Sequence, residues 1–384
     1  MTARNDPLSD RRLWVGVSTP AEREARGELL RYCLARGASI DQLREAVRED
    51  RLATLPLEFT LTSRRRYTLT ALATRAKVPA PYLREALLAL GYPNPRPRER
   101  AYSEEDLHTA RALAIFLAAG LPRRELLDVA RVIGQSLAQT ANVIRTFIGD
   151  ALIQPGDNEH ELGMRYVGAV NELAPQLAPM LEQALRVHIR EQATRDVIGR
   201  AEREAGTLSH PRQVAVCFAD LSGFTRLGER VATEQVGALG TRMATMCIEV
   251  AQPPVELVKT VGDAGMFVSA DVDALLDAQR LLADRVDAEG EDFPTMRAGT
   301  AFGPAVFRLG DWFGATVNRA SRITDAAKPG TILVDPETRG KAAERFHWSR
   351  ERRRSLKGID GRIALYRLAS DQPPPRRRRL SLAR

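Results

Sequence analysis

Two apolar runs in the second half of the chain have the pattern of buried β-strands. Val214–Phe218 is continuously apolar, as expected of a central strand that is covered on both faces, and it delivers Asp220 to its end. Val255–Val268 contains two β-patterned runs folded about Gly262 and Asp263, which predicts a hairpin. The pattern therefore brings two aspartates to the ends of adjacent strands.

The segments around these strands alternate between helical and strand patterns. Thr233–Val250 and Val272–Ala288 have the apolar spacing of amphipathic helices. Arg297–Phe307 predicts a pair of strands bent at Gly303. Further strands are predicted at Thr331–Val334 and Ala364–Leu368. Strands interleaved with helices, partly in hairpins, indicate an α+β or α/β domain.

The first half of the chain carries a helical pattern. Apolar residues recur at three- and four-residue steps within residues 1–62 and again from Met164 onward. In the later run, Pro175 and Pro179 are expected to kink or split the helix. We predict an all-helical domain over residues 1–205, followed by the second domain over residues 206–370. Residues 164–205 would form a coupling helix between them.

Residues 67–135 predict a helix, a turn, a second helix and a wing-like loop, and Ser103–Asp106 is a capping box that opens another helix. This order resembles the MerR-type DNA-binding module, which implies a basic surface that contacts phosphates. The cations of that surface would be Arg64, Arg65, Arg66, Lys77, Arg84, Arg96, Arg98 and Arg100. Glu85 in the recognition helix and the proline-rich wing argue against DNA as a partner. We therefore favour a packing and regulatory module.

Composition adds a few limits. The chain has 384 residues, 44% hydrophobic and 28% charged, which is ordinary for a globular protein of two domains. We find no apolar run of the ~20 residues that a membrane helix needs and no secretory signal, and the three cysteines form no spaced pattern. We therefore expect a cytoplasmic protein without an integral membrane segment. Part of the net charge of +8 lies in residues 371–384, which we expect to be a disordered basic tail.

Three blocks carry the candidate chemistry: Phe218–Thr225, Lys259–Asp263 and Gly310–Arg322. Together, in this order, they resemble the class III nucleotidyl cyclases, and the resemblance covers roughly residues 211–368. It implies a ferredoxin-like catalytic domain that converts ATP into 3′,5′-cyclic AMP and pyrophosphate. Such a cyclisation requires a deprotonated 3′-hydroxyl, in-line attack at the α-phosphorus and neutralisation of the pyrophosphate charge.

The resemblance also implies roles for single residues. Asp220 and Asp263 would hold two Mg²⁺ or Mn²⁺ ions, with the backbone carbonyl of Leu221 as a further ligand. Taken alone, either aspartate could equally be a turn-capping residue. Asn318 and Arg322 lie four residues apart and therefore share one helical face. In the family, these positions orient the ribose and neutralise charge on the α-phosphate.

The choice of base would fall to Lys259 and Asp311. Adenine offers an acceptor at N1 and a donor at N6, so a lysine donor beside an aspartate acceptor is complementary to it. Guanine presents O6 and N1–H, and would favour an acceptor such as Glu in place of Lys259. The pair therefore predicts ATP as substrate. Lys357, in the short block Ser355–Gly358, matches the triphosphate-binding lysine of the family.

In the family, the metal-binding aspartates come from one subunit, and the base-reading and transition-state residues come from the other. This chain has one copy of each block, so the resemblance implies a homodimer with two composite sites. A proton, a lipid such as a fatty acid, or another small molecule could be the effector of the helical domain. Two alternatives are a DNA-binding regulator with a nucleotide-sensing cyclase-like domain and a guanylyl cyclase. Retention of Asp220 and Asp263 argues against the first, and Lys259 with Asp311 argues against the second.

Overall fold

The structure is a computed structural model that describes residues 7–195, 211–224, 233–290, 292–349 and 351–369. The chain divides into two compact units, residues 1–194 and 195–384, and each unit is described separately below. The predicted domain boundary after residue 205, the last residues of the predicted coupling helix and the predicted tail over residues 371–384 lie outside the described residues.

The helical unit begins with a cluster of short helices. They are η1 (Pro7–Ser9), η2 (Arg11–Trp14), α1 (Pro20–Ala35), α2 (Ile40–Arg48), η3 (Leu52–Thr54) and α3 (Leu55–Leu61). Capping boxes at Thr19 and Ser39 fix the starts of α1 and α2. Leu29 and Leu30 are fully buried between these helices, as the apolar stripe predicts.

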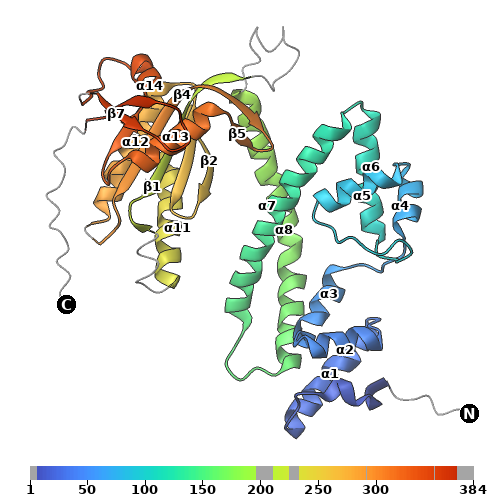
Figure 1. The fold of residues 1–384 in the computed structure, drawn as a ribbon. Coiled ribbons are helices and arrows are strands. Elements are labelled where there is room, and N and C mark those ends of the chain that lie inside the picture. The colour runs from blue at the N-terminus through green and yellow to red at the C-terminus, as the bar shows by residue number, and fades with distance from the viewer. Residues whose placement is uncertain (1–6, 196–210, 225–232, 291, 350, 370–384) are drawn as a thin grey trace, which may run out of the picture. The chain divides into compact units, whose positions relative to one another are not determined.

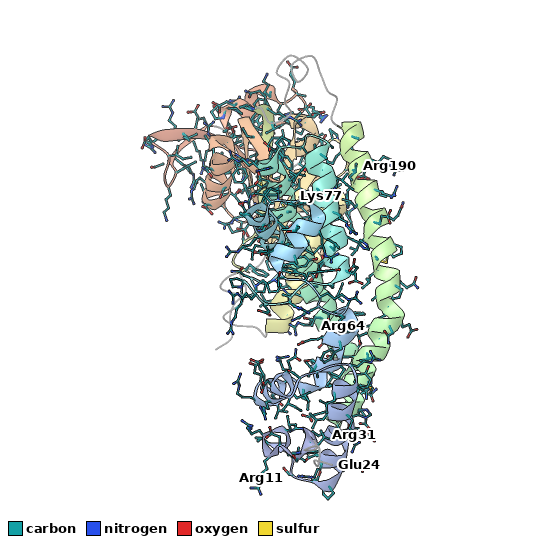
Figure 2. All side chains as sticks on the ribbon, turned by 90° about the vertical axis from the view of Figure 1, so that its right-hand side faces the viewer. Arg11, Glu24, Arg31, Arg64, Lys77 and Arg190 are labelled. Carbon is teal, nitrogen blue, oxygen red and sulfur yellow. The ribbon has the colours of Figure 1, made fainter. Side chains whose placement is uncertain are left out.

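Three further helices follow, α4 (Leu69–Ala76), α5 (Ala80–Ala89) and α6 (Glu104–Ala118). Lys77, with a φ of 58°, ends α4 and leads through a tight turn into α5. Ser103 caps α6, and Asp106 completes the predicted capping box. Arg64 and Lys77, labelled in Figure 2, are exposed. The likeness of this segment to the MerR-type module stays a prediction.

The helical unit ends with two long helices, α7 (Arg123–Leu152) and α8 (Glu159–Arg195) (Figure 1). At their junction, Arg165 donates a 2.6 Å hydrogen bond to Asp157 and also bonds the carbonyl of Leu152. Pro175 and Pro179 were expected to kink or split this run; α8 is continuous through both prolines, so the split is wrong, whereas the kink stays a prediction. Each proline lacks a backbone N–H and so removes one hydrogen bond of the helix, whereas the residues in the flanking turns keep their N–H groups.

The second unit is built on an eight-stranded sheet in the order β2-β3-β1-β4-β6-β8-β7, with β5 paired to β4. Its elements are β1 (Arg212–Leu221), α11 (Thr233–Val250), β2 (Glu256–Val261), β3 (Ala264–Ser269), α12 (Val272–Ala288), β4 (Met296–Arg308), β5 (Asp311–Phe313), α13 (Ala315–Ala326), β6 (Ile332–Val334), α14 (Pro336–Lys341), β7 (Arg352–Ser355) and β8 (Arg362–Arg367). The path β1-α11-β2-β3-α12-β4, with β1 between β3 and β4 in the sheet, is the ferredoxin-like arrangement.

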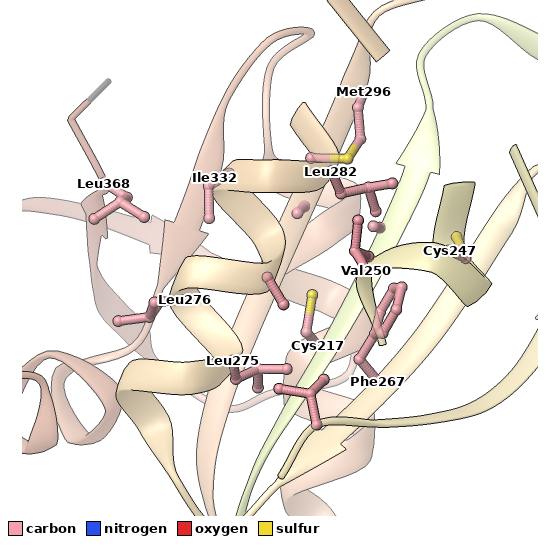
Figure 3. Close-up of a cluster of buried hydrophobic side chains, with 14 of the residues drawn as sticks. Cys217, Cys247, Val250, Phe267, Leu275, Leu276, Leu282, Met296, Ile332 and Leu368 are labelled. Carbon is pink, nitrogen blue, oxygen red and sulfur yellow. The ribbon is translucent and has the colours of Figure 1, made fainter. Parts of the chain in front are cut away.

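Both faces of β1 are buried. Ala215, Cys217 and Ala219 pack under α11 and α12, and Figure 3 shows Leu275 of α12 against the Cys217 side of the sheet. Val214 and Val216 face the other way, into the core beneath α13. The continuous apolar run correctly predicted this double burial. Because side chains alternate along a strand, Asp220 belongs to the α13 face.

The α13 face depends on a very close approach between helix and sheet. A Cβ at Gly299 of β4 would lie 2.2 Å from the backbone nitrogen of Thr324, so only glycine fits beneath α13. Thr324 also donates a 3.1 Å hydrogen bond to the carbonyl of Phe218. The predicted strand pair bent at Gly303 is wrong, because β4 is one strand of 13 residues and Gly303 stays paired with Val214.

Candidate active site

Two aspartates meet at the end of β1. Asp220 is paired with Ala264, and Asp263 directly precedes Ala264 in a two-residue turn that Gly262 enters with a φ of 61°. Burial, a hydrogen bond with Asp220 and the negative charge of Asp220 together raise the pKa of Asp263 to about 7. The backbone N–H of Leu221 acts in the opposite direction by favouring the charged carboxylate of Asp263. Asp263 therefore gains and loses its proton near neutral pH.

Arg297 is a further member of this cluster that the sequence reasoning did not single out. It lies directly opposite Asp220 on β4, and its Nε and Nη2 donate to Asp220 Oδ2 at 3.0 and 2.6 Å. Its Nη1 reaches the carbonyl of Asp325 at the end of α13, at 3.4 Å. The only signal in the sequence was its position at the start of a predicted strand. Its importance follows from the β1–β4 register, which the sequence alone does not provide.

The donors at this point suit a hard divalent cation. Asp220 and Asp263 offer carboxylate oxygens, which Mg²⁺ and Mn²⁺ prefer over nitrogen or sulfur. Among the described residues, no group of three or more His, Cys, Asp or Glu side chains is suited to hold a metal. Mg²⁺ commonly takes one or two carboxylates and completes its shell with water and substrate phosphates. The hydroxyl of Ser222, two residues after Asp220 in the chain, is buried without a partner in the described structure. The residues therefore fit such an ion.

A second charged cluster joins Lys259 of β2 to Asp311 of β5. The Lys259 ammonium donates to the Asp311 carboxylate in an ion pair. Asp311 is positioned by the tight turn at Leu309 and Gly310, whose φ values of 55° and 74° suit a two-residue hairpin. The Asp311 carboxylate also accepts a 2.9 Å bond from the N–H of Trp312. The two side chains are 42% and 26% exposed, so a planar ligand can reach both.

The remaining predicted residues lie on α13 and on the β7–β8 hairpin. Helix α13 begins after Gly314, where glycine is favoured because its φ is 140° and an added Cβ would lie 3.2 Å from the Pro304 carbonyl oxygen. Asn318 is exposed, and Arg322 pairs with Asp325 at 3.2 Å. Lys357 is exposed in the turn between the two strands.

The structure thus brings the predicted residues together in groups. The metal-binding candidates form one cluster and the base-reading candidates form another. In the described parts of the chain, no hydrogen bond or ion pair that we observe joins the two clusters directly. Arg322 is connected to the first cluster only indirectly, because its partner Asp325 also contacts Arg297.

Comparison with known proteins decides the family. Residues 10–193 match the adenylate cyclase regulatory domain, and residues 208–370 match the adenylate and guanylate cyclase catalytic domain. Adenylate cyclases of Streptomyces griseus and Streptomyces coelicolor are 34% and 33% identical, over 72% and 75% of this chain and 70% and 74% of their own. The chain belongs to the class III adenylate cyclases.

Another adenylate cyclase, described as pH-sensitive and found in Mycobacterium tuberculosis, is 39% identical over 66% of this chain. The matched region spans 65% of the length of that relative. The family predicted from the three motif blocks is therefore confirmed, as is its enzyme class, since adenylate cyclases are phosphorus–oxygen lyases. Within the described residues of this cyclase, no helix is long and apolar enough to cross a membrane.

Proposed function

We propose that this protein converts ATP into 3′,5′-cyclic AMP and pyrophosphate, as a homodimer with two composite active sites. The observation that carries the proposal is the Asp220–Asp263 pair, whose carboxyl groups are held so close that the pKa of Asp263 rises to about 7. Two carboxylates held this close repel each other when both are ionised, and a divalent cation bound between them offsets that repulsion.

The metal end would be formed by Asp220, Asp263 and the backbone carbonyl of Leu221, with Mg²⁺ or Mn²⁺ as the ions. When bound, these ions lower the pKa of the 3′-hydroxyl and neutralise charge on the triphosphate. Asp263 must give up its proton to take part, and Arg297 must release Asp220. The released guanidinium of Arg297 stays beside the triphosphate, where its permanent charge neutralises phosphate oxygens.

Adenine would be recognised by the Lys259–Asp311 pair. Lys259 donates to N1 of the base, and Asp311 accepts from the N6 amino group. The ion pair has to open for this, and because both groups are partly exposed, its loss costs only about 0–1 kcal/mol. Guanine would present N1–H to the ammonium and O6 to the carboxylate, two repulsive contacts.

Asn318 and Arg322 lie one helical turn apart on α13 and would address the ribose and the α-phosphate. Arg322 is held by a surface pair with Asp325 that a phosphate can replace. Lys357, at the tip of the β7–β8 hairpin, would bind the triphosphate. Asn318, Arg322 and Lys357 would act with Lys259 and Asp311 on the nucleotide whose metal ions the other subunit holds.

The helical unit would regulate the catalytic unit through α8 and the segment that follows it. A proton is one candidate effector, since one relative is named pH-sensitive and His188 is exposed on α8. A lipid or another small molecule is the other. Comparing cyclic AMP formation by the full chain with that of a chain beginning near Thr207 gives the sign of this control.

The direct test is an assay of the purified full chain with ATP and Mn²⁺, beside the Asp220→Ala variant. Cyclic AMP from the wild type and none above background from the variant supports the proposal. A matched variant, Asp284→Asn, removes an exposed carboxylate of α12 and should keep the wild-type rate. Absence of cyclic AMP from a folded, dimeric wild-type protein with either Mg²⁺ or Mn²⁺ overturns it.

A further inference from the structure

A second anion site is suggested by a basic cavity on the catalytic unit, whose lining shares no residue with the two charged clusters. It has a volume of about 230 Å³ and is lined by parts of β6, β7 and β8 together with the segment after α13. Four of its lining side chains are cations: Lys328, Arg352, Arg354 and Arg367. Aspartate and glutamate are absent from the described lining.

The strand register explains why these cations gather. Arg352 is paired with Leu365, so Arg352, Arg354, Leu365 and Arg367 all lie on one face of the β7–β8 ladder. Leu333 of β6, opposite Arg367, continues this face. Leu365 is buried and forms the apolar floor, whereas Arg354 is half-buried. The cavity is thus a basic rim over an apolar base.

The opposite face of the same strand is arranged differently. Arg353 points the other way and donates to Glu351 at 2.9 Å. Within the described residues, the structure records no ion pair for the side chains of Lys328, Arg352, Arg354 or Arg367. Like charges on neighbouring strands repel one another. Glu351 neutralises Arg353 on one face of the strand, whereas an anion would be needed to offset the repulsion among the cations on the cavity face.

We propose that this cavity binds a compact oligophosphate anion of the size of pyrophosphate. Two linked phosphate groups supply enough negative charge and enough acceptor oxygens for four cationic side chains, three of them forked arginines. The cavity lies at the base of the β7–β8 hairpin that carries Lys357 at its tip. Occupancy would therefore hold the hairpin strands together next to the triphosphate-binding lysine.

Pyrophosphate is also the by-product of the cyclisation, and this link rests on the proposed function, whereas the binding site itself does not. An anion held here would make the enzyme responsive to the level of the product it releases. The same chemistry could alternatively be supplied by the triphosphate of a free nucleotide, so the test includes both ligands.

The experiment is calorimetric titration of the full chain with sodium pyrophosphate in EDTA, where binding through divalent metals is excluded. The double variant Arg352→Gln/Arg354→Gln should lose affinity at least about tenfold, which corresponds to roughly 1.4 kcal/mol. Arg353→Gln, on the other face of the same strand, should bind like the wild type. Higher salt should weaken the wild-type affinity, because the contacts are partly exposed charges.

Two parallel titrations identify the ligand and the site. In the first, metal-free ATP is tested as a competitor of pyrophosphate. If ATP competes, and the same double variant weakens ATP binding, the site is an oligophosphate site that also accepts the triphosphate of a nucleotide. Loss of pyrophosphate binding in Lys357→Gln but not in the double variant assigns the binding to the active site and overturns the proposal. Equal loss in Arg353→Gln and in the double variant, or absence of binding by the wild type, also overturns it.

Thermal melting of each variant shows whether it is folded, and cyclic AMP formation is measured on the same preparations. A protein that makes cyclic AMP but does not bind pyrophosphate refutes the anion site alone. A protein that binds pyrophosphate through Arg352 and Arg354 but makes no cyclic AMP refutes the proposed function alone.

Discussion

The two charged clusters of the catalytic unit differ in the sign of their members. At the end of β1, Asp220 and Asp263 are like charges held within hydrogen-bonding distance, so that burial and mutual repulsion raise the pKa of Asp263 to about 7. Between β2 and β5, Lys259 and Asp311 are opposite charges that neutralise each other. The first cluster is poised for an added cation. The second is already neutral, and an adenine base bound there, as we propose, would have to open the ion pair.

Removing one carboxylate from the first cluster should have the largest effect. We expect Asp220→Asn to lower kcat by at least about a thousandfold, or roughly 4 kcal/mol, because the metal would lose a charged ligand. The measurement is the rate of cyclic AMP formation at saturating Mn²⁺. A residual rate within tenfold of the wild type would show that the pair is structural.

Reversing the second cluster should change the base rather than abolish the chemistry. In Lys259→Glu/Asp311→Asn, an acceptor faces guanine N1–H and an amide donor faces O6, so we expect the ratio of kcat/KM for ATP to that for GTP to fall about 100-fold. Parallel assays with both nucleotides measure this ratio. An unchanged ratio would remove Lys259 and Asp311 from base recognition.

Gly299→Ala tests whether α13 must lie directly on the sheet to support both clusters. Its methyl group would collide with the backbone of α13 near Thr324, and we expect the free energy of unfolding to fall by about 1–3 kcal/mol. Gly340→Ala is the matched control, since a Cβ at Gly340 meets nothing within 4 Å. Chemical denaturation of both variants makes the comparison, and equal stabilities would contradict the close packing.

The smallest effect concerns pH. Between the ordinary pKa of 3.8 and the raised value of about 7, folded Asp263 keeps a proton that the unfolded chain has lost. The metal-free protein should therefore become less stable as pH rises through this window. Mn²⁺ affinity should rise over the same window and level off above it, because the ion competes with that proton.

Electron paramagnetic resonance of free Mn²⁺, recorded without nucleotide from about pH 5.5 to 8.5, measures this affinity. Asp263→Asn should bind Mn²⁺ more weakly and with a flatter pH profile. A wild-type affinity that does not change below about pH 7 would contradict the raised pKa of Asp263.

Much of the catalytic unit could be predicted from the sequence because its signals are local. The apolar run before Asp220 predicted double burial, and the Gly262 turn predicted the β2–β3 hairpin; both are confirmed. The contacts that we did not predict join segments that are far apart in the sequence. Arg297 belongs to the Asp220–Asp263 cluster only because the β1–β4 register sets it opposite Asp220. The spacing of residues along the chain does not show how β1 and β4 are aligned.

Two errors have a common cause. Gly303 and the prolines of α8 were interpreted by their intrinsic preferences, which favour bends and breaks. In the structure, Gly303 stays in the β1–β4 ladder, and α8 runs through Pro175 and Pro179. Neighbouring hydrogen bonds that continue on both sides of these residues outweigh the local preference.

The most direct test of the account is a heterodimer, purified through two different tags, in which one chain carries Asp220→Ala and the other carries Lys259→Ala with Arg322→Ala. If the two clusters that bind one nucleotide come from different subunits, all three substitutions fall in one of the two sites, and the other site keeps all its wild-type residues. The account then predicts about half the wild-type rate of cyclic AMP formation per dimer, although each parent homodimer is inactive. A heterodimer as inactive as its parents would contradict it, since both clusters would then have to come from the same chain.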